Sequence, residues 1–98
     1  MMSEHEQFMA VALEEARLAL AEGEFPVGCA MVANNGIVAR GRRRNSIEGY
    51  RNEIDHAEVV TLRRLIAEQP GLDLATVTVY TTMEPCLMCY ATLLLSGI

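Results

Sequence analysis

Residues 27–40 read VGCAMVANNGIVAR, and this stretch decides how the chain folds. Apolar and small residues fill positions 27–33, the turn-forming residues Asn34, Asn35 and Gly36 follow, and a second apolar run ends at Arg40. Two short apolar runs around an asparagine-glycine turn predict an antiparallel β-hairpin. We therefore expect two neighbouring strands here, to which the remaining elements must be joined.

Further elements are predicted on both sides of the hairpin. Residues 4–22 repeat apolar side chains at the spacing of an amphipathic helix, with Ser3 as its cap and Gly23 as its stop. The other predicted elements are a surface loop over residues 42–55, a helix over 56–68 capped by Asp55, a strand over 76–81 and a helix over 85–96. The order αββαβα indicates an α/β fold, with helices on both faces of a sheet that is mostly parallel apart from the hairpin.

Length and composition limit the class of protein. The chain has 98 residues, of which 51% are hydrophobic and 21% charged, so we expect a single folded domain over residues 1–98. The longest apolar runs are far shorter than the roughly 18 residues that a membrane span needs, and the start of the chain does not read as a signal sequence. These features predict a cytoplasmic protein with no membrane partner. The net charge of −5 argues against nucleic-acid binding over the whole surface but leaves a local basic patch open.

The predicted last helix lacks a polar face. No charged residue lies between Cys86 and Ser96. A helix of this kind is expected to be buried around most of its circumference. We therefore expect it to be covered, either by a partner subunit or by polypeptide beyond Ile98.

Three residues at the starts of two predicted helices have the side chains that zinc prefers. They are His56, in residues 56–58 (HAE), together with Cys86 and Cys89, in residues 85–89 (PCLMC). Three cysteines, an odd number, in a chain without an export signal indicate metal or redox chemistry rather than a disulfide framework. Helix N-termini also favour thiolate over thiol. The pattern predicts that His56, Cys86 and Cys89 bind Zn²⁺.

Three protein ligands are typical of a catalytic zinc site, which keeps a fourth position for water and lowers the pKa of that water toward about 7. Glu58, two residues after His56, is placed to transfer protons between such a water and a substrate. Cys29 is interpreted as a buried strand residue and His5 as a solvated residue near the N-terminus, so neither is predicted to be a fourth ligand.

Each of these motifs is ambiguous when it stands alone. A first-turn glutamate can merely complement the helix dipole, and a Cys-x-x-Cys can be a dithiol redox pair or a zinc knuckle. The conjunction is more specific, because His-x-Glu followed by Pro-Cys-x-x-Cys is the signature of zinc-dependent base deaminases.

On these motifs the chain resembles the cytidine deaminase-like superfamily over nearly its whole length. Within that superfamily it is most similar to bacterial tRNA adenosine deaminases and to the related guanine and fungal cytosine deaminases. Residues 24–28 (EFPVG) resemble the passage from the first helix into the first strand, and residues 81–89 (TTMEPCLMC) resemble the second zinc motif. The resemblance implies a three-layer αβα sandwich and a homodimer. It also implies an incomplete domain, because family members continue past the position of Ile98 with two more strands and at least one helix.

The resemblance further implies which residues bind the substrate. Asn45 lies where the family places an asparagine that hydrogen-bonds the base, and Phe25 and Val27 lie where the family lines the base pocket. Ala57 belongs to the matched His-Ala-Glu motif and is expected to contact the base as well.

The chain departs from these relatives at two places that bear on the substrate. Residues 52–55 read NEID, where the tRNA-editing and guanine-deaminating relatives usually carry Asp-Pro-Thr and one more residue. Tyr90 follows the second zinc cysteine, where the editing enzymes tend to have small residues.

These observations imply hydrolytic deamination of a nucleobase, with adenosine in a tRNA anticodon as the first substrate. Residues 42–44 (RRR), with Arg51, are interpreted as holding backbone phosphates; the alternative is a solvated strand end. Besides a dithiol redox role for Cys86 and Cys89, two other functions stay open here. One is deamination of a free base or nucleotide such as guanine, cytosine or deoxycytidylate, and the other is a non-catalytic, zinc-stabilised subunit.

Overall fold

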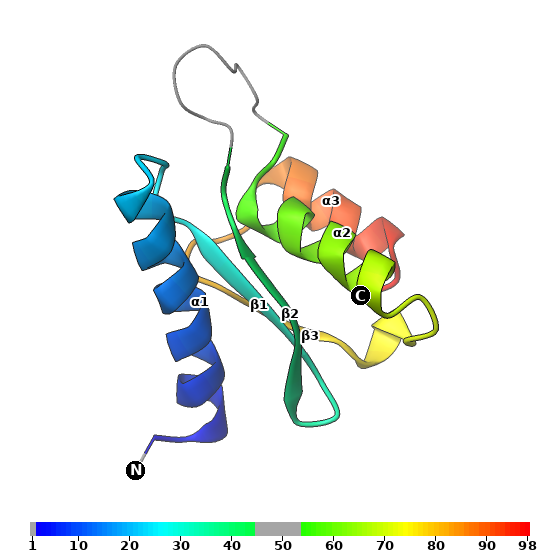
Figure 1. The fold of residues 1–98 in the computed structure, drawn as a ribbon. Coiled ribbons are helices and arrows are strands. Elements are labelled where there is room, and N and C mark those ends of the chain that lie inside the picture. The colour runs from blue at the N-terminus through cyan, green and yellow to red at the C-terminus, as the bar shows by residue number, and fades with distance from the viewer. Residues whose placement is uncertain (1, 45–53) are drawn as a thin grey trace.

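The computed structural model describes residues 2–44 and 54–98, which form three strands and three α-helices (Figure 1). The elements are α1 (Glu4–Ala21), β1 (Gly28–Ala33), β2 (Gly36–Arg42), α2 (Ala57–Glu68), the 3₁₀ turn η1 (Leu74–Thr76), β3 (Thr78–Thr81) and α3 (Leu87–Leu95). The predicted order αββαβα is therefore confirmed.

The hairpin is formed by β1 and β2, which pair antiparallel as predicted. Asn34 and Asn35 have φ angles of 53° and 61°, so these two residues make the turn and Gly36 already pairs with Ala33 in the sheet. Two consecutive left-handed residues are typical of the type I′ hairpin turn, whose twist matches that of the strands.

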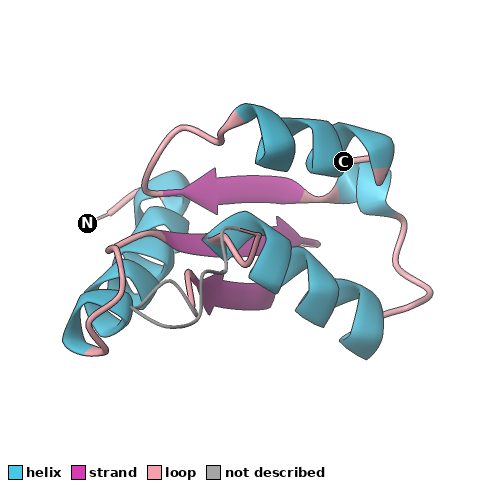
Figure 2. Cartoon of the chain, turned by 90° about the horizontal axis from the view of Figure 1, so that it is seen from above, coloured by secondary structure: helices cyan, strands magenta, loops and turns pink. Residues whose placement is uncertain are grey.

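The expectation of a mostly parallel sheet is wrong for the described strands. The strand order is β2-β1-β3, and β1 pairs antiparallel with both neighbours, as the three strands lying side by side in Figure 2 show. The segment from β2 through α2 to β3 does return the chain in the same direction. Since β1 lies between β2 and β3, however, no two parallel strands are hydrogen-bonded to each other.

The core lies on both faces of β1, which is buried along its whole length. Because successive side chains of a strand point to opposite faces, β1 contributes to two clusters. Cys29, Met31 and Ala33 pack with α2 and α3, whereas Ala30 and Val32 pack with α1. Figure 1 shows α1 on one side of the sheet and α2 with α3 on the other, which confirms the expected helices on both faces.

The helix ends follow the sequence signals with one exception. Ser3 caps α1 in a reciprocal capping box with Glu6, and Gly23, at φ 81°, lies just beyond the helix end. Asp55 does not cap α2; the N-cap is His56, whose side chain makes no capping bond. The Asp55 carboxylate instead accepts a hydrogen bond from Arg63 at 2.5 Å, so this charge pairs with a guanidinium almost two turns into the helix.

Two glycines let the helices approach the sheet closely. A Cβ on Gly28 would lie 2.0 Å from the carbonyl oxygen of Ala12, and a Cβ on Gly41 would lie 2.7 Å from the hydroxyl of Thr61. Because α1 and α2 rest directly on these positions, a larger residue would push either helix away from the sheet.

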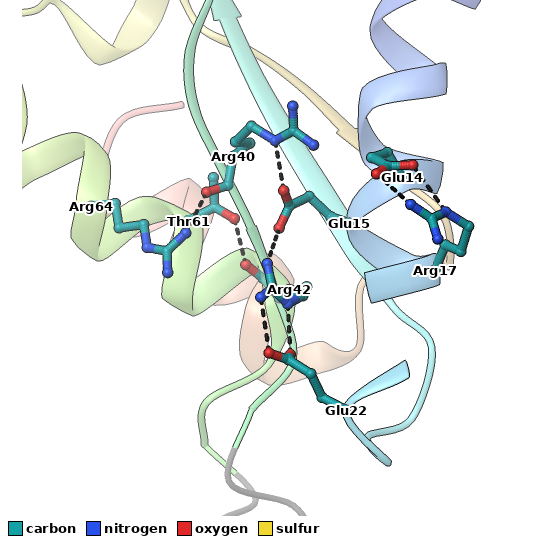
Figure 3. A network of polar contacts seen from close by, with 9 residues as sticks. Glu14, Glu15, Arg17, Glu22, Arg40, Arg42, Thr61 and Arg64 are labelled. Atoms are coloured by element: carbon teal, nitrogen blue, oxygen red, sulfur yellow. Dashed lines mark hydrogen bonds and ion pairs between the residues drawn. The ribbon is translucent and has the colours of Figure 1, made fainter. Parts of the chain in front are cut away.

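A network of charges, here called the α1–β2 clasp, joins α1 to β2 and consists of Glu15, Glu22, Arg40 and Arg42 (Figure 3). Glu15 accepts hydrogen bonds from Arg40 at 2.6 Å and from Arg42 at 2.9 Å. Arg42 also donates to both carboxylate oxygens of Glu22, at 2.7 and 3.0 Å. These bonds from Arg42 hold the pKa of the Glu22 carboxyl below its usual range.

α3 exposes the apolar face that points away from the rest of the described chain. Among the described residues of α3 only Cys89 and Leu93 are buried, whereas Leu87 and Leu95 are 85% and 90% exposed. The helix packs against α2 through one side, and its apolar outer face is left uncovered by the described chain. The expected cover, a partner subunit or polypeptide beyond Ile98, stays a prediction. No described helix is long and apolar enough to cross a membrane.

The prediction of a buried residue is confirmed for Cys29, whereas the prediction of a solvated residue holds only in part for His5. Cys29 is fully buried in the core, as expected, and burial raises the pKa of its thiol to about 12. His5 is exposed, but its Nδ1 lies 2.5 Å from the hydroxyl of Tyr80, so it links α1 to β3 rather than being surrounded by solvent alone.

Candidate metal centre and pocket

The N-termini of α2 and α3 place the predicted metal ligands. His56 is the N-cap of α2 and Cys86 is the N-cap of α3, and each residue's carbonyl accepts the first backbone bond of its helix, from Val60 at 2.9 Å and from Tyr90 at 2.8 Å. Cys89 lies one turn further along α3 and is fully buried. The two helices start beside each other, so residues thirty positions apart in the chain become neighbours.

His56, Cys86 and Cys89 form a compact group of donor atoms. The Nδ1 atom of His56 lies 3.6 Å from the sulfur of Cys86 and 3.4 Å from the sulfur of Cys89, and the ligand atoms all lie within 4.8 Å of one another. A tetrahedral zinc ion, with bonds of about 2.0–2.1 Å to nitrogen and 2.3 Å to sulfur, separates such atoms by about 3.6 Å. The donor set and its spacing therefore fit a zinc ion bound by three protein ligands.

The ionisation of this group depends on whether a cation is bound. Burial, and then the negative charge of the Glu58 carboxylate, raise the pKa of the Cys89 thiol. A divalent cation at the group reverses this shift, because a coordinating thiol gives up its proton to the metal.

A pocket of about 130 Å³ opens next to the metal ligands. Its lining includes six of the residues singled out in the sequence: Phe25, Val27, His56, Ala57, Glu58 and Cys86. These come from the segment before β1, from the start of α2 and from the start of α3, so the fold gathers three separate stretches of chain at one place. Asn45, the remaining expected substrate contact, lies outside the described residues.

Glu58 has the position expected of a proton carrier. It is in the first turn of α2, lines the pocket beside His56 and Cys86, and is only 4% exposed. An isolated first-turn glutamate that serves the helix dipole would lie at the surface. Here the carboxylate faces a cavity that adjoins the candidate metal group, which is where proton transfer to a bound molecule is chemically useful.

Two pocket residues, Met83 and Glu84, were not singled out, and Arg43 was singled out only as part of the arginine run. Met83 and Glu84 directly precede Pro85, so the matched motif contained a signal for them. Arg43 belongs to the arginine run, in which nothing in the sequence separates it from its neighbours.

The arginine run does not act as one patch. Arg42 is engaged by Glu15 and Glu22 in the α1–β2 clasp, and the Nε of Arg44 lies 3.7 Å from a carboxylate oxygen of Asp55. For Arg42 these two carboxylates favour the alternative to a phosphate contact, because they already pair with its guanidinium. Arg51 lies outside the described residues.

Comparison with known protein families and sequences gives a consistent result. Residues 2–98 match the family model described as the cytidine and deoxycytidylate deaminase zinc-binding region. The tRNA-specific adenosine deaminase 2 of Danio rerio is 41% identical over 97 residues, which cover 93% of this chain and 44% of the relative. A tRNA-specific adenosine deaminase of Streptococcus pyogenes is 35% identical over 88 residues, which cover 90% of this chain and 54% of the relative. The chain thus spans about half the length of these two relatives.

Solved structures show the same fold. One from a study of A-to-I editing by tRNA deaminases at the wobble position of transfer RNA superposes with a TM-score of 0.87 at 31% identity, covering 98% of this chain and 72% of the other. Guanine deaminase from Bacillus subtilis superposes with a TM-score of 0.78 at 28% identity, covering 95% and 58% of the two chains. The three-layer α/β arrangement predicted from the motifs is therefore confirmed.

Proposed function

Because the chain belongs to the family of the cytidine and deoxycytidylate deaminase zinc-binding region, we propose that it takes part in zinc-dependent hydrolytic deamination of a nucleobase. The observation that carries this proposal is the pocket in which the buried Glu58 carboxylate lies next to the group of His56, Cys86 and Cys89. A metal group without such a carboxylate would support a structural site equally well.

The residues of the pocket divide the work between them. His56, Cys86 and Cys89 would hold zinc, which when bound lowers the pKa of a water toward about 7 and so supplies a nucleophile at neutral pH. Glu58 accepts a proton from the attacking water and donates it to a ring nitrogen of the base. The carbon that gains the water oxygen then loses its exocyclic amine. That amine takes up the remaining proton of the added oxygen through Glu58 and leaves as ammonia, while the carbon–oxygen bond becomes a carbonyl.

The walls of the pocket suit a flat, largely apolar ring. Val27 and Ala57 are buried beside Glu58, and the exposed Phe25 and Met83 extend the apolar lining outward. In this proposal Phe25, Val27 and Ala57 pack against the base, and Asn45 hydrogen-bonds to it. These contacts leave the edge that carries the amine turned toward Glu58.

The first proposed substrate is adenosine in a tRNA anticodon, converted to inosine. Support comes from relatives on both the sequence and the structural side, since two are named tRNA-specific adenosine deaminases and a third protein is described by its wobble-position editing. A second candidate is a free base such as guanine, which the superposition with guanine deaminase favours. A non-catalytic subunit is a weaker alternative, because it has no use for the pocket-facing Glu58. The homodimer and the cytoplasmic location stay predictions.

A substrate panel tests the proposal. Zinc-loaded protein is incubated with a tRNA anticodon stem-loop, guanine, cytosine and deoxycytidylate, and mass spectrometry records the exchange of an amino group for oxygen. We expect conversion of the stem-loop, with loss of turnover in Glu58→Gln. Glu68→Gln is the matched control, since Glu68 is an exposed residue of the same helix. A folded, zinc-bound protein that converts nothing would contradict the proposal, and conversion of guanine alone would replace the first substrate by the second.

A further inference from the structure

A second cavity, of about 210 Å³, lies beside β2, which is an edge strand of the sheet. Its described lining residues are all charged: Glu22 at the end of α1, Arg42 at the end of β2, Arg44, and Arg64 of α2. It shares none of them with the pocket that Glu58 lines. The chain therefore has a separate cavity in which arginines outnumber the carboxylate three to one.

The negative charge in this lining is already balanced. Arg42 donates to both carboxylate oxygens of Glu22, at 2.7 and 3.0 Å. Arg42 also donates to Glu15, which accepts a further hydrogen bond from Arg40. The α1–β2 clasp thus combines two carboxylates with two guanidinium groups and adds no net charge. The excess positive charge of the cavity belongs to Arg44 and Arg64.

Arg64 is held in place by a contact that leaves its charge unbalanced. One N–H of its guanidinium donates to the main-chain carbonyl oxygen of Arg40 at 2.9 Å (Figure 3). This acceptor is neutral and takes one of the five donors of the guanidinium group. Within the described part of the chain, Arg64 forms no ion pair with a carboxylate. An exposed cation is therefore positioned at the edge of β2 with most of its donors available.

Arg44 shares its carboxylate neighbour with another arginine. Its Nε lies 3.7 Å from one carboxylate oxygen of Asp55, which is longer than a hydrogen bond, and the other oxygen accepts from Arg63. One carboxylate between two guanidinium groups does not balance both of them. The backbone N–H of Arg44 donates to the carbonyl oxygen of Asp55 at 3.2 Å, which fixes the origin of the half-exposed side chain.

We propose that Arg44 and Arg64 bind a phosphate group in this cavity, here called the β2-edge site. Guanidinium groups form charge-assisted hydrogen bonds to phosphate oxygens, and their planar fork matches a pair of such oxygens. The net charge of −5 repels anions from the chain as a whole, so a local excess of arginine fixes where one is bound. An RNA backbone and a free phosphate compound present this same chemistry. The proposal goes beyond the proposed function, because the site lies outside the deamination pocket.

Phosphate probes without a reactive base test the β2-edge site. Zinc-loaded protein is titrated with a fluorescent oligouridylate, whose anisotropy is recorded at several salt concentrations, and inorganic pyrophosphate and oligoglutamate are added as competitors. We expect Arg64→Ala to weaken oligouridylate binding about tenfold and to reduce the salt slope by about one. Arg44→Ala is expected to act in the same direction. Arg64→Lys, which keeps the charge without the fork, should keep the salt slope and lose part of the affinity.

Arg17→Ala is the matched control, since Arg17 is an exposed arginine of α1 that pairs with Glu14 outside the cavity. The thermal midpoint of each variant is recorded, and if Arg64→Ala lowers it, Arg44→Ala decides in its place. Absence of binding by both phosphate probes, unchanged affinity in Arg44→Ala and Arg64→Ala, or an equal loss in Arg17→Ala would overturn the site.

The competitors identify the source of the phosphate. Displacement of the oligouridylate by pyrophosphate at an equal concentration of phosphate groups assigns the site to a free phosphate compound. An oligouridylate that resists this competition assigns the site to an RNA backbone. Competition by oligoglutamate as strong as that by pyrophosphate would overturn the preference for phosphate and indicate an acidic peptide instead. No probe carries a base with an exocyclic amine, so the outcome does not depend on whether the chain deaminates a base.

Discussion

Glu15 and Glu58 are equally buried, each with 4% of its surface exposed, yet they belong to regions of opposite character. Glu15 lies in the α1–β2 clasp, where Arg40 and Arg42 donate hydrogen bonds to both of its carboxylate oxygens. Glu58 lies on the lining of a cavity and shares it with two of the candidate metal ligands.

The difference teaches that burial alone does not identify a functional carboxylate. The charge of Glu15 is balanced by the chain's own arginines, which fits a role in holding two elements together. The charge of Glu58 faces space that another molecule can enter, and it adds to burial, the larger cause, in raising the pKa of the nearby thiols of Cys29 and Cys89. The charge of Glu15 is thus balanced within the chain, whereas the role of Glu58 depends on the molecule that binds in the pocket.

The largest expected effect comes from Glu58→Gln. We expect turnover to fall by between about a hundredfold and ten-thousandfold, the range of general acid-base catalysis, because glutamine cannot accept and return a proton. The measurements are the rate of deamination, the zinc content by elemental mass spectrometry and the midpoint of thermal unfolding. Zinc content and thermal midpoint should stay close to those of the unmodified protein; a large fall in either would show that Glu58 is a structural residue like Glu15.

Gly28→Ala is expected to disturb the packing of α1 on β1 near Glu15, because the added methyl group has no space. The new Cβ would meet the Ala12 carbonyl oxygen at 2.0 Å and the Ala16 nitrogen at 2.5 Å, so α1 must move away from β1. We expect the free energy of unfolding to fall by about 3 kcal/mol, measured by urea denaturation. Gly71→Ala is the control, because nothing lies within 4 Å of a Cβ at that position. Equal stability of the two variants would mean that α1 does not rest on β1 as described.

Glu15→Gln weakens the same region electrostatically. It removes a buried negative charge between two arginines whose side chains are 40% and 27% exposed. Because both arginines keep access to water, we expect a loss of about 2 kcal/mol in the free energy of unfolding, less than for a fully buried pair. The matched change, Glu14→Gln, alters an exposed pair with Arg17 and should leave stability unchanged. If Glu15→Gln lost more turnover than its loss of stability explains, the assignment of a purely structural role to Glu15 would be contradicted.

The smallest expected effect is the alkylation of Cys29, which we assign to the core and not to the metal group. Cys29, with a pKa of about 12, stays protonated at pH 8, where only about one molecule in ten thousand carries the reactive thiolate. Iodoacetamide should therefore label the exposed Cys86 of zinc-free native protein and leave Cys29 unlabelled, as read by peptide mass spectrometry. Zinc is expected to protect Cys86. Labelling of Cys29 before Cys86 would contradict the assignment of Cys29 to the core.

Local signals in the sequence predicted much of this molecule. The cap at Ser3, the helical periodicity of residues 4–22 and the turn after β1 depend on signals within a few residues, so their structures could be predicted from local sequence alone. The metal group was predictable for a different reason. Its residue types are rare in combination, and the position of each at a helix start is set locally.

What escaped prediction depends on strand order and side-chain face. The insertion of β1 between β2 and β3 brings together residues far apart in the chain, and no local pattern encodes it. Arg42 and Arg43 show the same limit at the scale of single residues. They are chemically identical neighbours at the end of β2, yet one binds Glu15 and the other lines the pocket.

The placement of β1 at the centre of the sheet has a consequence for the order of folding. Its pairing with β2 closes across two turn residues, whereas its pairing with β3 joins Val32 to Thr78 and must close a far longer loop. The hairpin is therefore expected to form early and β3 to dock late. Because Cys86 and Cys89 follow β3 in the chain, they reach His56 only when that late step is complete. The rate of metal binding during refolding would thus report the rate of the last folding step and not that of the first.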